Sequence, residues 1–234
     1  AFSLLSKKNE MIHILLIGKT KQVAELQAKL ANIVDIKIAV NEPISSNYQW
    51  IIDADFEDNL YRIQQYALLE NTLVMVAAVR KQLAESVAKS DIKALKCCLV
   101  GFNALPTFIN RPLWEISLFR SSDLLVLDTF LSKINMAYKI VADRVGMVTP
   151  RIVCMIINEA FYAAQEKIAS REAIDKAMKL GTRHPYGPFE WAEKIGIENV
   201  YLCLSAIYED TKDECFKISP ALKTAYWKAK NVAF

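Results

Sequence analysis

The sequence lacks several features that would point directly to a function. No C-x-x-C pair occurs among the five cysteines, and neither of the two histidines has a cysteine or carboxylate at a recognisable ligand spacing. We therefore expect no metal site. The lysines are spread along a chain of net charge +3, so no dense basic patch forms, and we expect no nucleic-acid partner.

Long hydrophobic runs are also absent. Apolar segments such as LVMVAAV and IVCMII are far shorter than the roughly 18 residues that a membrane helix needs, so we expect no membrane partner. The opening AFSLLSKKNE lacks the apolar core of a secretory signal. Four of the five cysteines lie within apolar patterns, which predicts buried thiols, a reducing compartment and a cytoplasmic location.

The composition that is present favours a folded chain of two domains. Hydrophobic residues make up 53% and charged residues 24%, which is typical of a core-forming protein. A length of 234 residues lies between one large domain and two modest ones. We expect an α/β domain over residues 1–144 and a helical domain over residues 145–234.

Strands and helices alternate in the first domain. Apolar runs predict strands at 11–18, 34–40, 48–56, 72–79 and 94–102, and intervening helices at 59–70 and 81–90. Val23, Leu26 and Leu30 lie on one face of a further helix after the first strand. This alternation predicts a parallel sheet, and the short segment after the second strand predicts a sheet smaller than a full doubly wound one.

The second domain shows only helical patterns. In residues 149–168, Ile152, Met155, Ile156, Ala160 and Ala164 form one apolar stripe, with Pro150 near the helix start. Ser170 is predicted to cap the next helix and Gly181 to end it. Gly196 is predicted to end a short helix from residue 189, and Ser219 with Pro220 to begin the last one.

The turn after the first strand carries an incomplete dinucleotide fingerprint. A dinucleotide site needs G-x-G-x-x-G, so that bare backbone meets the pyrophosphate, but this chain has GKTKQV. Gly18 fills the first position, whereas Thr20 and Val23 fill the other two. Lys19 and Lys21 remain available to draw a phosphate toward the helix N-terminus. Gly18, Lys19 and Thr20 thus predict a weakened cofactor site or none.

The second domain resembles a known family. The segment from Asn158 to Val200 contains N-E-A, then E-K-I-A-S-R-E-A-I-D-K-A-M-K-L-G and P-Y-G-P-F-E. Its order and spacing are similar to the C-terminal helical domain of 3-hydroxyacyl-CoA dehydrogenases. IIDADFED and VGMVTPRIV match further family segments less closely. The resemblance implies a shortened Rossmann-like domain, the cofactor NAD, an acyl-CoA or nucleotide ligand, and a homodimer formed through the helical domain.

The resemblance also allows the catalytic positions to be placed. The family oxidises a 3-hydroxyl with a His as base, held by a Glu, in a G-L-H-F-F-N-P stretch that is followed by V-E-V. On GFNALPTFINRPLWEI the His position falls on Asn103 and the Glu position on Glu115. An amide can position a substrate oxygen but cannot accept its proton near neutral pH. A Glu beside Trp114 at a strand start is as readily a solvated or salt-bridged residue as a catalyst.

Two polar helper positions are also unmatched. The family Ser falls at Val79 or Arg80, and the family Asn falls on Pro150. Losing the base alone costs a factor of about 100 to 10,000 in rate. Two hypotheses remain open: a degenerate homologue that only binds an acyl-CoA, a nucleotide or a partner, and an active oxidoreductase that uses Glu115 or a substrate-borne group as base.

Overall fold

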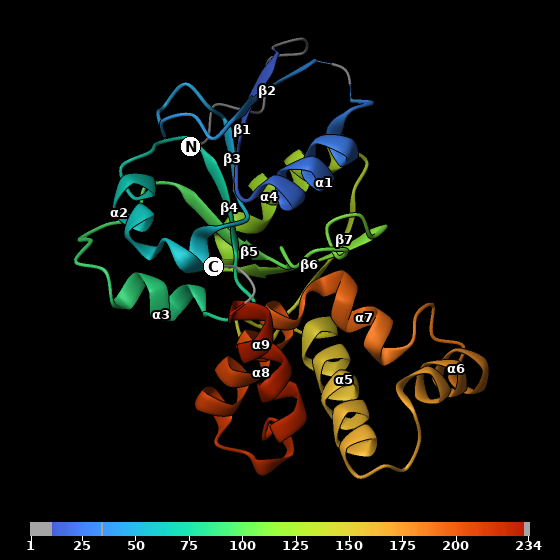
Figure 1. Ribbon diagram of the computed structural model, residues 1–234. Coiled ribbons are helices and arrows are strands. Elements are labelled where there is room, and N and C mark those ends of the chain that lie inside the picture. The colour runs from blue at the N-terminus through green and yellow to red at the C-terminus, as the bar shows by residue number, and fades with distance from the viewer. Residues whose placement is uncertain (1–10, 34, 232–234) are drawn as a thin grey trace. The chain divides into compact units, whose positions relative to one another are not determined.

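The computed structural model describes residues 11–33 and 35–231, so the opening AFSLLSKKNE lies outside the described residues. The chain divides into two compact units, residues 1–147 and residues 148–234. Figure 1 shows the strands gathered in the first unit and only helices in the second. The fold is thus a mostly parallel sheet domain followed by a helical domain, which confirms the predicted fold class.

A seven-stranded sheet forms the first unit, in the order β2-β1-β3-β4-β5-β6-β7. The strands are β1 (Ile12–Ile17), β2 (Ile36–Val40), β3 (Trp50–Asp53), β4 (Leu73–Ala77), β5 (Cys98–Phe102), β6 (Leu113–Leu118) and β7 (Ala137–Ile140). The segment between β2 and β3 contains neither helix nor strand, as its length predicted. The order reverses at β1 and β3, and ligands of doubly wound sheets bind at such a switch point.

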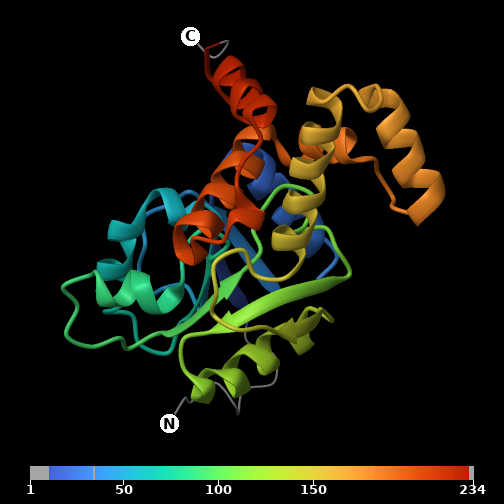
Figure 2. The same cartoon turned by 90° about the horizontal axis from the view of Figure 1, so that it is seen from below.

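Two layers of helices cover the sheet. Helices α1 (Thr20–Leu30) and α4 (Leu124–Lys133) pack on one face, and α2 (Ile63–Tyr66) and α3 (Leu83–Ala88) on the other. Figure 2 shows α4 lying along β6 and β7. The apolar stripe predicted for α1 is confirmed, because Val23, Leu26 and Leu30 are buried.

Three expectations about the first unit were wrong or incomplete. Strand β6 runs antiparallel to β5, whereas alternation had suggested a wholly parallel sheet. Helix α4 and strand β7 were not predicted. The helix expected over 59–70 is a 3-10 turn followed by four α-helical residues. The direction of a strand depends on the end of the sheet from which the chain enters it. The local apolar pattern carries no information about that.

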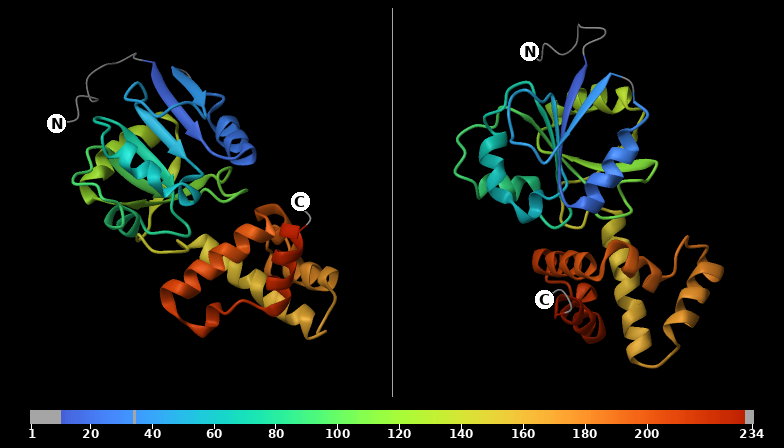
Figure 3. Two further views of the ribbon diagram at one scale, coloured as in Figure 1. Left: turned by 60° about the vertical axis from the view of Figure 1, so that its left-hand side comes forward. Right: turned by 45° about the horizontal axis from the view of Figure 1, so that its top comes forward.

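The second unit contains α5 (Thr149–Gln165), α6 (Arg171–Thr182), α7 (Pro188–Ile195), α8 (Ile197–Thr211) and α9 (Pro220–Asn231). Figure 3 shows α5 lying between α6 and the pair α8 and α9. The Ser170 hydroxyl accepts from Ala173 N at 3.2 Å, and the Ser219 hydroxyl from Leu222 N at 3.1 Å, so both predicted caps are confirmed. Gly196 ends α7 as predicted.

Two details of the second unit correct the sequence interpretation. Helix α6 continues through Gly181 and ends at Thr182, and the next residue, Arg183, adopts the left-handed conformation that Gly181 was expected to supply. The buried face of α5 is formed by Val153, Cys154, Ile157 and Phe161, whereas Ile152 is 53% exposed. The facing helices, and not the longest apolar stripe, decide which side of α5 is buried.

Candidate functional site

The candidate site lies at the carboxyl ends of the parallel strands. β1, β3, β4 and β5 all point the same way, so the turns that follow them meet at one edge of the sheet. Gly18 follows β1, Asp53 ends β3, and Asn103 follows β5. Gly18 and Asn103, which the sequence singled out for cofactor and catalysis, therefore lie at the edge where α/β sheets bind ligands.

Gly18 makes a close contact inside the protein. A Cβ at this position would lie 3.2 Å from the Cβ of Ala54, which follows β3. The Gly18 N–H donates to the side-chain oxygen of Asn41 at 3.0 Å, and the Asn41 amide donates back to the Gly18 carbonyl at 3.3 Å. The glycine is thus needed for the approach of two loops, and its backbone polar groups already have partners.

The other two residues proposed for a cofactor offer little to a pyrophosphate. The Lys19 ammonium lies 3.0 Å from Asp58 and 3.9 Å from Asp55. Thr20 is the first residue of α1 and is exposed, whereas Val23 is buried in the packing of the helix on the sheet. At this turn NAD would meet side chains and a paired lysine in place of bare backbone, so the residues present do not fit its pyrophosphate.

A buried carboxylate ties β3 to α2. Asp53 has no exposed surface, and both its oxygens lie 3.1 Å from Nη1 of Arg62. It also accepts from the Tyr66 hydroxyl at 2.7 Å and from Asp55 N at 2.9 Å. Burial raises the pKa of Asp53 in spite of these partners, and burial together with Asp53 raises the pKa of Tyr66. This network holds the loop after β3 in place.

A second ion-pair group follows it. Arg80 Nε lies 3.0 Å from Glu57, and Arg80 Nη2 lies 2.7 Å from Asp58. Burial alone would raise the pKa of Asp58, but hydrogen bonds from Arg80 and Lys19 lower it overall. The family Ser aligns with Val79 or Arg80. The Val79 side chain is buried and has no polar atom, and the Arg80 guanidinium is already paired with two carboxylates.

Asn103 and Glu115 lie one step beyond the last paired residues of β5 and β6. The β5–β6 register pairs Gly101 with Ser117 and Phe102 with Ile116, so the next step along the register sets Asn103 opposite Glu115. Asn103 is 6% exposed, and its side-chain oxygen accepts from Leu105 N at 3.2 Å. Glu115 is 9% exposed and is the third residue of β6, so of the alternatives left open for it, that of a solvated residue does not hold.

Helix α1 holds the loop that follows Asn103, a feature that the sequence interpretation missed. Gln22 Nε2 donates to the carbonyls of Ala54 at 3.0 Å and Ala104 at 2.9 Å. Three and seven residues further along the helix, both Glu25 oxygens accept from Thr107 N at 3.1 Å, and Lys29 Nζ donates to the Arg111 carbonyl at 2.8 Å. Residues at this spacing share one helix face.

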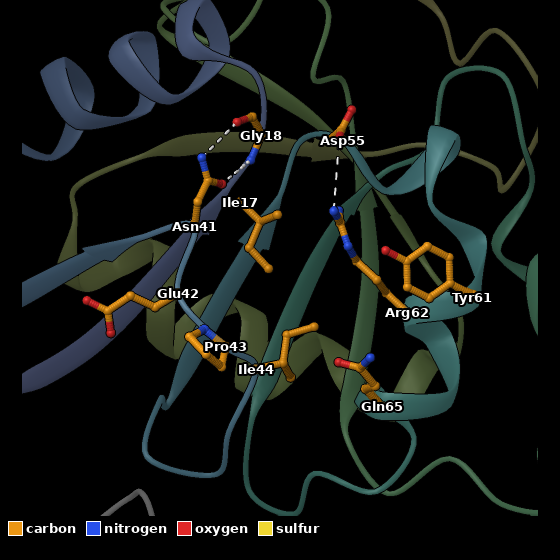
Figure 4. Close-up of a pocket in the computed structure, with 10 residues that line it drawn as sticks. All are labelled: Ile17, Gly18, Asn41, Glu42, Pro43, Ile44, Asp55, Tyr61, Arg62 and Gln65. Atoms are coloured by element: carbon orange, nitrogen blue, oxygen red, sulfur yellow. Dashed lines mark hydrogen bonds and ion pairs between the residues drawn. The ribbon is translucent and has the colours of Figure 1, made fainter.

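A pocket of about 400 Å³ opens beside the Gly18 turn. Figure 4 shows that its walls come from the end of β1, the segment after β2 and the segment around α2. The lining residues are Ile17, Gly18, Asn41, Glu42, Pro43, Ile44, Asp55, Tyr61, Arg62 and Gln65. Polar and apolar side chains both line it, and no local sequence pattern predicts the pocket because its walls come from three separate segments.

The remaining candidate residues form no site of their own. Pro150 lies in the first turn of α5, and His13 and His184 are half-buried. Within residues 11–33 and 35–231, no group of three His, Cys, Asp or Glu side chains could hold a metal ion. In the same residues, the structure contains no helix that is both long and apolar enough to cross a membrane.

The motif residues of the helical domain hold helices together. The Asn158 side chain donates to the Lys217 carbonyl at 2.9 Å and accepts from Ser219 N at 2.8 Å, so α5 is joined to the start of α9. Asp175 in α6 accepts from Phe189 N at 2.8 Å and Glu190 N at 3.2 Å, which satisfies the free N–H groups of α7. At Gly187 an added Cβ would lie only 2.2 Å from the Asp175 Cγ.

Comparison with known proteins identifies the helical domain. Residues 146–231 match the sequence profile of the 3-hydroxyacyl-CoA dehydrogenase C-terminal domain. The chain is 34% identical over 93 residues to a 3-hydroxybutyryl-CoA dehydrogenase of Bradyrhizobium diazoefficiens, which covers 40% of this chain and 32% of that protein. The chain thus spans about a third of the length of this curated relative.

Two further comparisons extend into the sheet domain. A 3-hydroxybutyryl-CoA dehydrogenase of Clostridioides difficile is 29% identical over 180 residues, covering 74% of this chain and 63% of that protein. The crystal structure of the (S)-3-hydroxybutyryl-CoA dehydrogenase of Ralstonia eutropha superimposes with a TM-score of 0.71 and 17% identity, over 92% of this chain and 93% of that one. At that identity the superposition shows a shared fold.

Proposed function

This chain belongs to the 3-hydroxyacyl-CoA dehydrogenase family, identified by its helical domain, and from that premise we propose a homologue whose dehydrogenase activity is weak or lost. One observation carries the proposal: Asn103 occupies the position of the catalytic base, at the end of β5 and opposite Glu115. The family reaction, NAD-linked oxidation of a 3-hydroxyacyl-CoA to a 3-ketoacyl-CoA, requires a group there that takes the hydroxyl proton.

The amide of Asn103 cannot supply that step. It has no ionisation near neutral pH, and its oxygen already accepts from Leu105 N. Neither Val79 nor Pro150 provides the hydroxyl or amide of a family helper. Because general-base catalysis contributes about 100- to 10,000-fold, we expect residual activity at least that far below an active relative.

The register supports a second candidate function. Glu115 lies opposite Asn103, so an active oxidoreductase would use this carboxylate as its base, with Asn103 orienting the substrate hydroxyl. A carboxylate accepts a proton from an alcohol less readily than an imidazole near neutral pH, because its ordinary pKa of about 4 lies further from the working pH. We therefore place this function second.

NAD is the cofactor of the family, and its binding to this chain is a separate part of the proposal. Bound NAD would supply the hydride acceptor. This chain's residues would have to receive it at Gly18, Lys19 and Thr20, where the lysine is paired with Asp58 and the glycine with Asn41. The proposal therefore includes weakened NAD binding.

We also propose that the chain forms a homodimer through its helical domain. Ile152 on α5, Ile168 after it and Leu180 on α6 are 53%, 71% and 73% exposed, which leaves apolar surface on this domain. Sedimentation equilibrium of the protein with Ile152→Glu, beside Glu159→Gln as an exposed control on the same helix, tests this. A monomer at all concentrations of the unsubstituted protein would contradict it.

The dehydrogenase proposal is tested in the reductive direction. Acetoacetyl-CoA and NADH are mixed with the protein, and the loss of NADH absorbance is compared with that of an enzyme-free control and an active 3-hydroxybutyryl-CoA dehydrogenase. We expect a rate at least about 100-fold below that of the active enzyme. A comparable rate means that catalysis is intact. Loss of that rate in Glu115→Gln would then favour the second function.

Restoring a base at position 103 tests whether activity is low because one residue is missing or because several residues of the site have changed. Asn103→His supplies an imidazole, but Val79 and Pro150 remain, so we expect the rate to stay within about tenfold of the starting protein. Asn110→His, at an exposed position of the same loop, is the matched control. A gain of about 100-fold in Asn103→His alone would show that the remaining site is functional.

A further inference from the structure

A second pocket, of about 260 Å³, lies between the segment around α2 and the segment around α3, and we call it the α2–α3 pocket. The described residues that line it come from residues 60–64 on one side and from residues 81–90 on the other. It meets the pocket beside the Gly18 turn at Tyr61, which lines both. Asn103, Glu115 and the Gly18 turn do not line it, so a ligand bound here would be independent of the dehydrogenase proposal.

The charged side chains of the α2–α3 pocket leave an excess of positive charge. Lys89 Nζ lies 2.6 Å from a Glu85 oxygen, and Lys81 Nζ lies 4.0 Å from the same oxygen, which is beyond hydrogen-bond distance. The hydrogen bond from Lys89 lowers the pKa of Glu85, so this carboxylate is ionised near neutral pH. One carboxylate thus faces two ammonium groups, and an anion that enters the pocket would be attracted by the second of them.

The uncharged side chains favour an apolar body for that anion. Ile63 is 2% exposed and lines the pocket together with Leu60, and Tyr61, which is 61% exposed, offers an aromatic ring on which another ring can stack. The hydroxyls of Ser86 and Ser90 donate to main-chain carbonyls of their own segment at 2.9 and 2.6 Å. An anion would therefore be bound by the lysines and not by these hydroxyls.

The volume of the pocket sets the size of the ligand. Pockets for drug-sized ligands measure about 300 to 1,000 Å³, so a pocket of about 260 Å³ suits a single ring and cannot enclose a whole acyl-CoA. We propose that the α2–α3 pocket binds a small aromatic carboxylate. The carboxylate would lie between the Lys81 and Lys89 ammonium groups, and the ring would pack on the apolar side of the pocket.

Benzoate, benzyl alcohol and benzylamine test the proposal, because they share a ring and differ in charge. Each is titrated into the whole protein, and binding is followed by the NMR chemical shifts of the backbone amides. We expect benzoate to bind with a dissociation constant below about 5 mM, and about fivefold more tightly than the neutral alcohol or the cationic amine. Equal affinity for the three compounds, or no binding of benzoate at about 20 mM, would overturn the proposal.

The same spectra locate the ligand. The largest shifts caused by benzoate should fall within residues 60–64 and 81–90, which line the α2–α3 pocket. Shifts centred on residues 41–44, which line the pocket beside the Gly18 turn, would show that the assignment is wrong. Because neither NAD nor turnover enters these measurements, their outcome is separate from that of the dehydrogenase assay.

Two pairs of variants with matched changes in net charge test the role of the charges. Lys81→Gln removes the ammonium group that is not hydrogen-bonded to Glu85, and it should weaken benzoate about fivefold. Lys93→Gln, at an exposed position outside the pocket, should leave the affinity unchanged. Equal affinity in these two proteins would show that the pocket does not hold the carboxylate.

The second pair should act in the opposite direction. Glu85→Gln removes the carboxylate that competes with the ligand for both lysines, so benzoate should bind more tightly by about fivefold. Asp91→Asn, at an exposed position outside the pocket, is its control and should cause no gain. If Glu85→Gln binds benzoate no more tightly than Asp91→Asn does, the lysines are not the anion-binding groups.

Discussion

The two domains of this chain resemble the same family in different ways. In the helical domain the residues of the family motif are present, and Asn158 and Asp175 each make two hydrogen bonds that join one helix to the next. In the sheet domain the strand order is that of a nucleotide-binding fold, but the turn after β1 lacks the second and third glycines of the dinucleotide fingerprint, and Asn103 stands at the position proposed for the family base. One domain matches through residues that hold the structure, and the other mainly through its strand order.

This difference shows that the match of the helical motif reports on fold and not on catalysis. Gly187 and Asp175 fit one another because a helix N-terminus must be capped and two helices must pass closely, a requirement that does not depend on catalysis. A strong match there establishes ancestry and fold. The residues proposed to decide function, Asn103, Glu115 and the Gly18 turn, belong to the other domain.

The largest effect is expected where the helical motif is most crowded. In Gly187→Ala the added Cβ would lie 2.2 Å from the Asp175 side chain, so α6 and α7 must separate, and we expect the free energy of unfolding to fall by about 3 kcal/mol. Gly181→Ala is the matched control, because nothing lies within 4 Å of its Cβ. That change should stabilise α6 by about 0.5 to 1 kcal/mol. Chemical denaturation measures both, and equal effects would disprove the packing argument.

In the sheet domain, the buried carboxylate of Asp53 is expected to be comparably important for stability. Asp53→Ala leaves Arg62 and the Tyr66 hydroxyl without their buried partner, and we expect a loss of about 2 to 3 kcal/mol. Asp91→Ala, at an exposed position of the same domain, should change stability by less than about 0.5 kcal/mol. If Asp53→Ala proves as mild as its control, this network does not hold the loop after β3.

The third prediction concerns the loop that follows Asn103, which α1 contacts. Glu25→Ala removes the acceptor of Thr107 N, and Thr107 has a φ of 75°, an unfavourable conformation for a β-branched residue. We expect a loss of about 1 kcal/mol and faster amide hydrogen exchange over residues 104–111. Glu159→Ala on exposed α5 surface is the control. Unchanged exchange in this loop would show that α1 does not hold it.

Local structure was predictable from the sequence to the extent that neighbouring residues determine it. Ser170, Ser219 and Gly196 end or begin helices as expected, because caps act within one turn. The buried face of α5 and the end of α6 at Thr182 were predicted wrongly, since partners distant in sequence decide them. The contacts of Gln22, Glu25 and Lys29 with the loop join residues 82 positions apart, and no local pattern reports them.

The smallest predicted effect on stability concerns Asp58, and it distinguishes a contribution from its charge from a contribution from its packing. The pKa of Asp58 is lowered in the folded protein, so the folded state favours the ionised form. This contribution is fully present above the unfolded pKa of about 4 and is lost as the pH falls through the lower folded value. Because the Asp58 side chain is 40% exposed, its worth at pH 7 should be under about 0.5 kcal/mol. Asp58→Asn should therefore reduce stability slightly at pH 7 and not at pH about 2, whereas Asp91→Asn should show no such change. A deficit in Asp58→Asn that persists at low pH would mean that shape, and not charge, makes this residue stabilising.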